Sequence, residues 1–470
     1  MGINWDEGPA PISQREIGEI RNYIGDYGPY RQSERLDIYE KYIKQLLENE
    51  QAYFCFCSEE ELESQKQYQL SRGEAPKYSG KCQNLTKKEI NKNLQEGKSF
   101  VIRFKISPKK VKFKDLVRGE VEFDMKLAGD IVIAKNLRYP LFVLAGAIDD
   151  FAMQISHIIR GEDHLSNTPK QILLQEALGF PIPEYAHLPL ILGPDRTKLS
   201  KRRDAVAICE YRDQGYLPEA LVNFIAFLGW NPGTEREIYS MNSLVKEFSL
   251  ERVQKGAAVP NVKRLDFLNG FYIRQKSIEK LTEMSLPYLI KAGLIEESLD
   301  LSLKESEPEK LKLFSQTQPQ FKNKETGETI RLDKLEKIVA IYQERLKKLS
   351  EIPELTVFFF RKKIEYDKEL LKWGSMSDKE LKIILDKLEK ILSKIKESDW
   401  TKENLEEILI LESEKPIPAP DGEKGERGKL LWPFRVVLTG MKATAGPFEI
   451  AELLGKEKTL IRLKEAKQKL

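Results

Sequence analysis

Residues 187–202 read HLPLILGPDRTKLSKR and form the most informative stretch of the chain. The apolar run that opens the stretch predicts a buried strand, and Gly193-Pro194-Asp195 predicts a turn. The basic pentapeptide Lys198–Arg202 then predicts a cationic loop. Lysines on such a loop can reach phosphate oxygens and stabilise the charge that develops as pyrophosphate leaves. A solvated basic turn is the alternative, because short motifs of this kind are common.

The composition is typical of a large globular protein with several domains. The chain has 470 residues, of which 41% are hydrophobic and 32% charged, and its net charge is +3. This length predicts two to four domains. We expect no membrane association, because no run of 18 apolar residues occurs, and the first residues do not resemble a secretory signal. Four cysteines in so long a chain favour a reducing cytoplasm over a disulfide scaffold.

Periodicity and capping signals predict the secondary structure. We expect helices at 34–48 with Ser33 as N-cap, after the capping boxes Ser58/Glu61 and Thr86/Glu89, at 167–178 before Gly179, at 218–228 and at 380–395. We expect strands at 52–57, 100–106, 121–123, 130–133, 141–144 and 153–159. The chain after Leu217 is predicted to be mostly helical, with a loop at 415–429. Cys209 is expected on a buried helix face.

Several longer segments give the chain a family resemblance. The motif-bearing segments are 5–9 (WDEGP), 28–36 (GPYRQSERL), 116–119 (LVRG), 158–169 (IIRGEDHLSNTP), 216–221 (YLPEAL), 268–270 (LNG) and 446–450 (GPFEI). Together with the basic loop, which resembles the "KMSKS" loop of class I aminoacyl-tRNA synthetases, they resemble glutamyl-tRNA synthetase of the bacterial type. The resemblance is dense up to about residue 275 and thinner beyond it.

The resemblance implies an α/β fold with four parts. A Rossmann-type catalytic domain would comprise residues 1–57 and 145–215, and an inserted α+β subdomain for the tRNA acceptor stem would comprise 58–144. A helical stem-contact domain at 216–350 and a helical anticodon-binding domain at 351–470 would follow. We expect the charged helix faces of the last two parts to contact RNA phosphates, although a charged face is more often simply solvated.

The resemblance also implies the reaction and its participants. The protein would form glutamyl-adenylate from L-glutamate and ATP with Mg²⁺, and pass the glutamyl group to tRNA(Glu). It would act as a monomer by family analogy. Lys198, Ser200 and Lys201 would be the catalytic residues, and Lys198, Lys201 and Leu190 would contact ATP.

Arg160 is the residue expected to bind the amino acid in such a family. A guanidinium holds a carboxylate through two parallel hydrogen bonds, which an amide cannot match. The alternative is a structural arginine paired with Glu162 or Asp163. Phe142 stands where the family usually has a tyrosine that lines the glutamate pocket, so a hydroxyl is missing there.

Three cysteines and a tyrosine have the spacing of a metal site. Cys55 and Cys57 are followed by Tyr78 and then by Cys82. Thiolates suit Zn²⁺, and zinc-bearing members of the family have a similar Cys-x-Cys…Tyr-x-x-x-Cys pattern. Three ordinary thiols are the alternative. We assign His157, His164 and His187 to no metal or proton-transfer role, because a single His in an apolar strand is usually a buried core residue.

The sequence lacks the His-x-Gly-His motif that class I synthetases pair with the lysine loop. We therefore expect the catalytic domain to be incomplete at its N-terminus, by about one strand–helix–strand unit, and adenylate formation by this chain alone to be weak. The alternatives are a non-catalytic tRNA-binding or split-enzyme subunit and, more remotely, a glutaminyl enzyme.

Overall fold

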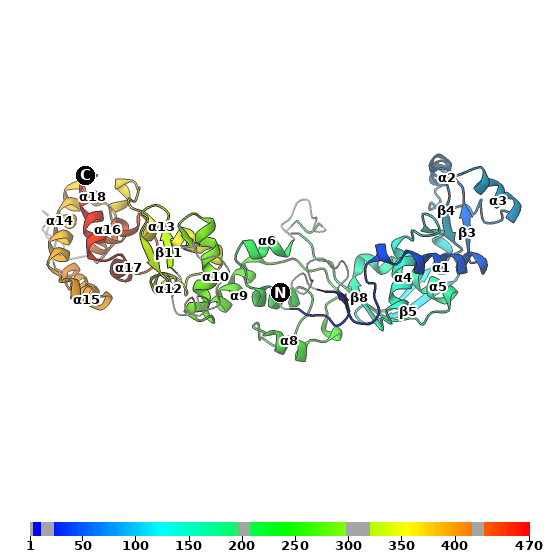
Figure 1. Ribbon diagram of the computed structural model, residues 1–470, viewed down its shortest axis with the longest axis horizontal. Coiled ribbons are helices and arrows are strands. Elements are labelled where there is room, and N and C mark those ends of the chain that lie inside the picture. The colour runs from blue at the N-terminus through cyan, green and yellow to red at the C-terminus, as the bar shows by residue number, and fades with distance from the viewer. Residues whose placement is uncertain (1–2, 11–22, 194, 198–206, 298–319, 416–426) are drawn as a thin grey trace, which may run out of the picture. The chain divides into compact units, whose positions relative to one another are not determined.

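The computed structural model describes residues 3–10, 23–193, 195–197, 207–297, 320–415 and 427–470. The chain forms two compact units, residues 1–204 with 225–260 and residues 205–224 with 261–470, whose elements can be followed in Figure 1. The four-part division predicted from the sequence is finer than these two units and stays a prediction. No helix within the described ranges has the length and apolar character needed to cross a membrane.

The first unit contains two main sheets. One has the strand order β6-β5-β9-β8 and the other the order β3-β4-β7. The strands are β3 (Ala52–Cys55), β4 (Val101–Phe104), β5 (Lys110–Asp115), β6 (Gly119–Asp124), β7 (Ile131–Ala134), β8 (His157–Gly161) and β9 (Glu184–Leu188), besides the short pair β1 (Gly8–Pro9) and β2 (Tyr23–Ile24). Strands β8 and β9 are parallel, and β9 also bridges β5 in parallel.

Helices α1 (Leu36–Glu48), α4 (Phe142–Ala152) and α5 (Thr168–Leu178) contribute to the hydrophobic core of this unit. Helix α5 connects β8 to β9, which makes the β-α-β unit typical of a Rossmann-type fold. The strand predicted at 141–144 is wrong, because α4 begins at Phe142. A short apolar run of this kind suits a buried helix as well as a strand.

The capping predictions are confirmed in part. Helices α2 (Glu59–Ser71) and α3 (Lys87–Gln95) begin at the two predicted capping boxes, and α5 ends at Gly179 in a left-handed conformation. Ser33 is not the N-cap of α1, since it lies in a 3-10 turn and Arg35 precedes the helix. The family-like segment around Arg35 is structural, because that buried guanidinium donates to Asp149 at 2.7 Å and to the Pro29 carbonyl.

The last α-helix of the first unit is α8 (Met241–Glu247), and the first α-helix of the second unit is α6 (Ile208–Asp213). The other helices are α7 (Pro218–Ala226), α9 (Val262–Arg274), α10 (Ile278–Lys291), α12 (Leu332–Ala340), α13 (Ile352–Phe360), α14 (Asp378–Lys394), α15 (Lys402–Ser413), α16 (Arg427–Thr439), α17 (Pro447–Leu454) and α18 (Lys456–Gln468). This half also contains a small antiparallel sheet that was not predicted, with β10 (Ile295–Glu297), β11 (Gln320–Asn323) and β12 (Thr329–Arg331). Cys209 on α6 is exposed, so its predicted burial is wrong.

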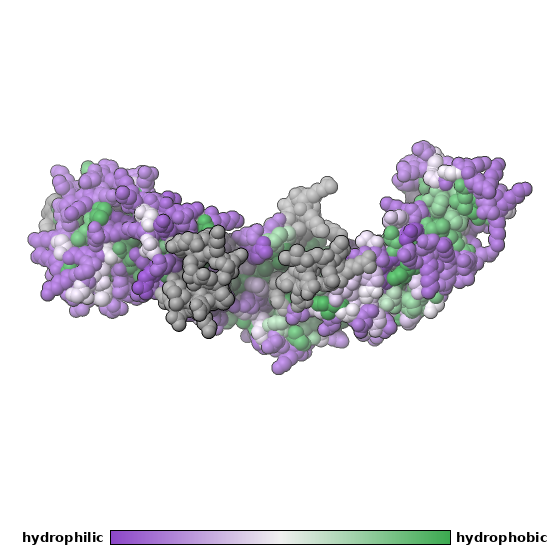
Figure 2. Space-filling model, in the orientation of Figure 1, coloured by the Kyte–Doolittle hydropathy of each residue, from purple (hydrophilic) through white to green (hydrophobic). Residues whose placement is uncertain are grey.

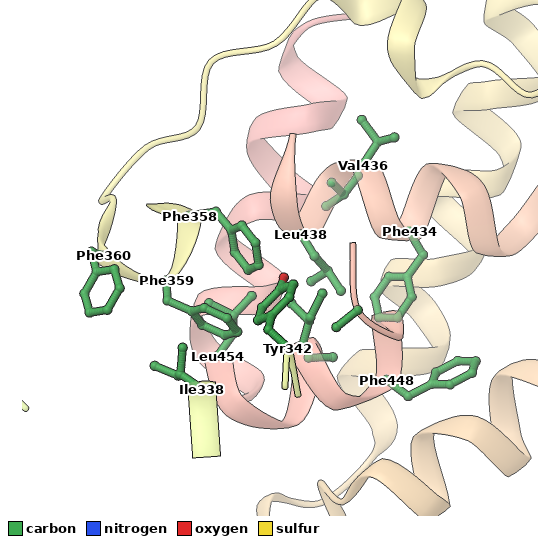
Figure 3. Packing of buried hydrophobic residues seen from close by; sticks show 14 of the residues in the cluster. Ile338, Tyr342, Phe358, Phe359, Phe360, Phe434, Val436, Leu438, Phe448 and Leu454 are labelled. Atoms are coloured by element: carbon green, nitrogen blue, oxygen red, sulfur yellow. The ribbon is translucent and has the colours of Figure 1, made fainter. Parts of the chain in front are cut away.

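One hydrophobic core joins most helices of the second unit. Aromatic side chains of α13 and α16 lie on either side of Tyr342, as Figure 3 shows for Phe358 and Phe434, and Phe448 of α17 belongs to the same cluster. Arg462 of α18 is buried in this region, and it donates to the Leu438 carbonyl and, at 2.5 Å, to the Phe358 carbonyl. These carbonyls lie near the C-terminal ends of α16 and α13, where helical acceptors need other partners.

Replacing Arg462 by leucine should destabilise the second unit. The substitution leaves buried carbonyl oxygens without donors, which costs about 3 kcal/mol. Urea unfolding followed by circular dichroism should show the lowered midpoint. Lys464→Leu on the exposed face of the same helix is the control and should change stability by less than about 0.5 kcal/mol. Equal stability of the two variants would contradict this role of Arg462.

Candidate active site

The candidate site lies where β8 and β9 end. Arg160 on β8 is the register neighbour of His187 on β9. In open α/β sheets, ligands bind in the crevice outside the carboxyl ends of parallel strands. The predicted amino-acid ligand Arg160 is therefore at a suitable edge of the sheet. Lys198, Ser200 and Lys201, the predicted phosphate-binding residues, lie outside the described residues.

A buried carboxylate fixes His187 beside Arg160. Asp115 at the end of β5 accepts hydrogen bonds from the backbone N–H groups of Val117, Arg118 and His187, and His187 Nδ1 lies 2.6 Å from Asp115 Oδ2. Burial raises the pKa of Asp115, but hydrogen bonds from the Arg118 amide and from His187 outweigh it and hold that pKa below its ordinary value. The ionised carboxylate makes His187 Nδ1 the protonated nitrogen.

The other ring nitrogen of His187 is then an acceptor for Arg160. Arg160 Nε donates to His187 Nε2 at 3.2 Å, and Arg160 Nη2 donates to Thr168 Oγ1 at 2.8 Å. Burial lowers the pKa of His187 below its ordinary value, although the hydrogen bond and the charge of Asp115 oppose this shift. The charges of Arg160 and Arg118 act in the same direction as burial. A neutral imidazole is the form that can accept from a guanidinium.

A second ion pair joins the neighbouring segments. Arg118 pairs with Glu162 and donates to the Lys255 carbonyl at 2.7 Å. Glu162 also accepts from the backbone N–H of Leu190 at 3.1 Å. The predicted ATP contact Leu190 is thereby tied to the segment that carries Arg160. The pairing of Glu162 with Arg118 also differs from the alternative in which Glu162 pairs with Arg160.

Phe142 is placed on the same unit at the start of α4. Half of its side-chain surface is exposed, and its ring lies 4.7 Å from the ring of His164 between centroids. His164 follows Arg160 by four residues, in the 3-10 turn after β8. Whether Phe142 lines the glutamate pocket, as predicted, is not tested by these contacts.

The predicted metal ligands come together near the end of β3. The sulfur atoms of Cys55, Cys57 and Cys82 all lie within 4.8 Å of one another. Tyr78 Oη is 3.4 Å from the sulfur atoms of both Cys55 and Cys57. Ligands at Zn²⁺ distances in a tetrahedron would be about 3.8 Å apart between sulfur atoms and about 3.5 Å between sulfur and oxygen. The four donor atoms therefore fit a tetrahedral zinc ion.

Arg103 borders this cluster, which the sequence did not predict. It is buried on β4 and donates through Nε to Cys55 Sγ at 3.2 Å. Its guanidinium also lies 3.9 Å from the centroid of the Tyr78 ring. Burial and the neighbouring thiols raise the pKa of Cys57 to about 11, although the Tyr78 hydroxyl opposes them. A divalent cation would favour the deprotonated thiols by binding their sulfur atoms.

Comparisons with known proteins agree with the family resemblance of the sequence. Residues 1–267 match the catalytic domain of class I tRNA synthetases (E and Q), and residues 280–467 match an anticodon binding domain. A glutamate–tRNA ligase of Caldicellulosiruptor saccharolyticus is 43% identical over 98% of this chain and 85% of its own length. The chain belongs to the glutamate–tRNA ligases. The enzyme of Carboxydothermus hydrogenoformans is 41% identical over 97% of the chain and 84% of its length.

Solved structures give the same answer. A glutamate–tRNA ligase from Elizabethkingia meningosepticum, in complex with its amino acid, superimposes with a TM-score of 0.73 at 29% identity. The match covers 95% of this chain and 85% of that one. As a glutamate–tRNA ligase, the protein uses ATP to attach glutamate to tRNA. These matches support neither a non-catalytic RNA-binding subunit nor the expected incompleteness of the catalytic domain.

Asp150 on α4 should make the stability of the protein depend on pH. Burial raises the pKa of Asp150 to about 6, although the charge of Arg160 opposes it. The carboxyl ionises near pH 3.8 in the unfolded chain. Above pH 6 the folded protein therefore holds an ionised carboxylate in a partly buried position, which destabilises the folded state. Asp150→Asn should therefore stabilise the ligase by about 3 kcal/mol at pH 7.5, and this gain should nearly vanish at pH 4.

Urea unfolding at the two pH values measures the gain. Asp37→Asn, which removes a carboxylate that is 90% exposed, is the control and should change stability by less than about 0.5 kcal/mol at either pH. A gain for Asp150→Asn that is equal at pH 4 and pH 7.5 would contradict the assignment, because it would not depend on ionisation.

Proposed function

We propose that the site at the ends of β8 and β9 is the glutamate site of this ligase and that Arg160 binds the substrate carboxylate. The observation that carries the proposal is the way Arg160 is held. Its Nε and Nη2 donate to neutral acceptors, His187 and Thr168, and the nearby Glu162 is engaged by Arg118. A guanidinium held in this way keeps its positive charge for an anionic ligand.

The proposed charge also explains substrate choice. Glutamate would bring a carboxylate that accepts two parallel hydrogen bonds, whereas glutamine offers one acceptor and a donor. A site that leaves its buried charge unpaired rejects the wrong ligand strongly. Phe142 would contribute an apolar wall without a hydroxyl contact.

The proposed reaction has two steps. The α-carboxylate of glutamate attacks the α-phosphorus of ATP, and the bond to pyrophosphate breaks. A terminal ribose hydroxyl of tRNA(Glu) then attacks the acyl carbon of the adenylate, and AMP leaves. We assign Lys198, Ser200 and Lys201 to the phosphates in the first step, where added positive charge lowers the barrier, and Leu190 to an ATP contact. Mg²⁺ would accompany ATP.

The second unit would dock the tRNA beyond its acceptor stem. Figure 2 shows mostly hydrophilic residues over this half of the visible surface. Lysines of α14 such as Lys390 and Lys394 line a surface cavity, and such charges suit phosphate contacts. We further propose the four-part layout at 1–57 with 145–215, 58–144, 216–350 and 351–470. A monomer acting in a reducing cytoplasm is proposed as well, in keeping with the free thiols.

Binding of glutamate tests the role of Arg160. Arg160→Gln should raise the KM for glutamate about 100-fold or more and leave the KM for ATP nearly unchanged, because the carboxylate loses a charged partner. Arg160→Lys should rescue only part of this loss, since an ammonium lacks the fork geometry. Pyrophosphate exchange and equilibrium dialysis with labelled glutamate provide the readouts. Arg138→Gln, which removes a half-exposed arginine paired with Asp37, is the control, and unchanged glutamate binding in Arg160→Gln would refute the assignment.

We also propose that Cys55, Cys57, Tyr78 and Cys82 hold one structural Zn²⁺. Closed structural zinc sites are four-coordinate, and these four residues supply the matching donor set. Arg103 would balance the negative charge of the thiolates from the second layer of contacts. The ion would fasten the end of β3 to the loop after α2.

Zinc content tests this proposal directly. The purified ligase should contain about one zinc per chain, and Cys82→Ser should lose it, since closed sites bind weakly without a full ligand set. Cys209→Ser, which changes the exposed thiol of α6, is the matched control and should keep the metal. Tyr78→Phe should retain zinc with faster release to a chelator. Absence of zinc from the unaltered protein after refolding with excess Zn²⁺ would contradict the proposal.

A further inference from the structure

We propose that His187, held by Asp115, is a positioning residue that fixes the orientation of the Arg160 guanidinium for the acidic substrate. This inference rests on the proposed role of Arg160. His187 would not touch glutamate itself. It would act by offering Nε2 as a fixed, neutral acceptor to Arg160 Nε.

The contacts of the network constrain where its protons lie, since His187 Nε2 has two neighbours, Arg160 Nε at 3.2 Å and Thr168 Oγ1 at 3.0 Å. The carboxylate oxygens of Asp115 accept hydrogen bonds from N–H donors, including His187 Nδ1 at 2.6 Å, so the imidazole proton is at Nδ1. Arg160 has only donors, so the 3.2 Å contact with His187 Nε2 requires an unprotonated nitrogen there. Asp115 therefore sets the tautomer that lets His187 accept from Arg160.

The network also fixes the plane of the guanidinium. Among the described residues, Arg160 forms hydrogen bonds through Nε and Nη2, to acceptors on two different elements, β9 and α5. Both acceptor residues are fully buried, since His187 and Thr168 have 0% relative exposure. A planar group bonded at two of its nitrogens to buried partners keeps one orientation, and its remaining N–H groups point to a defined place.

A neutral acceptor has a further advantage over a carboxylate at this position. The charge of Asp150 already acts on Arg160, and an arginine released from His187 and Thr168 would be free to turn toward such carboxylates of its own protein. That internal pair would compete with the substrate. His187 holds the guanidinium without neutralising it.

The backbone connection between β5 and β9 does not require the imidazole. Asp115 already links β5 to β9 through the backbone N–H of His187 at 3.1 Å, and β9 is also paired with β8 along its length. An apolar side chain of similar size would keep these backbone bonds. Besides its contacts with Asp115 and with Thr168 Oγ1, the imidazole supplies an acceptor for Arg160, which an apolar side chain cannot do.

The test compares His187→Leu and His187→Gln in the full chain. The leucine variant removes the acceptor, and its KM for glutamate should rise about 10- to 100-fold while its KM for ATP stays within about twofold. The glutamine variant can present an amide oxygen to Arg160 and should recover part of the loss. Partial unfolding would lower the amount of active enzyme, and therefore the apparent kcat, but would not change the KM for one substrate alone.

The matched control is Tyr185→Phe. Tyr185 lies on the same strand, stacks on His187 and bonds Gln175. Its ring centroid is 5.7 Å from the Arg160 guanidinium, and phenylalanine keeps that ring, so the variant removes only a buried hydroxyl that is no acceptor of Arg160. Both KM values should stay unchanged in it. Equilibrium dialysis with labelled glutamate should reproduce the ranking of the variants without any catalytic turnover.

Two different failures can be told apart. Unchanged glutamate binding in Arg160→Gln would remove the proposed function and this inference with it. Weakened binding in Arg160→Gln together with normal binding in His187→Leu would overturn the positioning role alone. Equal losses for glutamate and ATP in His187→Leu would also overturn it, because they would indicate a general disturbance of the fold.

Discussion

The short contact between Asp115 and His187, 2.6 Å long and fully buried, is the interaction on which the site depends. Burying a carboxylate is costly unless every oxygen finds a donor. Asp115 meets this requirement with backbone N–H groups of its own turn and of β9. The carboxylate stays ionised, and its charge decides which nitrogen of His187 carries the proton. A turn at the end of β5 thereby controls the hydrogen bonding of Arg160 on β8.

The same constraint explains why separate family-like segments belong together. Residues 116–119 supply the amides that hold Asp115, and Arg118 from that segment pairs with Glu162. Glu162 in turn accepts from Leu190, at the start of the stretch that leads into the basic loop. Each segment supplies a donor or acceptor that another segment needs. In a glutamate–tRNA ligase, this arrangement would keep the guanidinium of Arg160 hydrogen-bonded to the neutral acceptors His187 and Thr168 at the sheet edge where the acid is to bind.

Local signals in the sequence predicted local structure well. The capping boxes at Ser58 and Thr86 and the apolar spacing of α14 depend on residues a few positions apart, and the structure confirms them. The strand predicted at 141–144 failed because an apolar run does not reveal its own period. The predicted burial of Cys209 was wrong for a related reason. Helical spacing defines an apolar face but does not show whether another element covers it.

The site was predictable only where its residues have their own sequence signature. The Cys-x-Cys and Tyr-x-x-x-Cys spacings identified the four clustered donors, and the family resemblance identified Arg160. The roles of His187, Asp115 and Arg103 could not be predicted, because their partners are distant in the sequence. Asp115 and His187 are 72 residues apart, and Arg103 and Cys55 are 48 apart. The sequence around a single His in an apolar strand does not indicate which distant carboxylate will pair with it.

A crystal structure of the ligase with bound glutamate tests the central claim most directly. The account predicts the substrate side-chain carboxylate about 2.8 Å from the free N–H groups of Arg160, with the contacts from Arg160 to His187 and Thr168 intact. Glutamate bound with its carboxylates away from Arg160, or an Arg160 that leaves His187 to reach the substrate, would contradict the account.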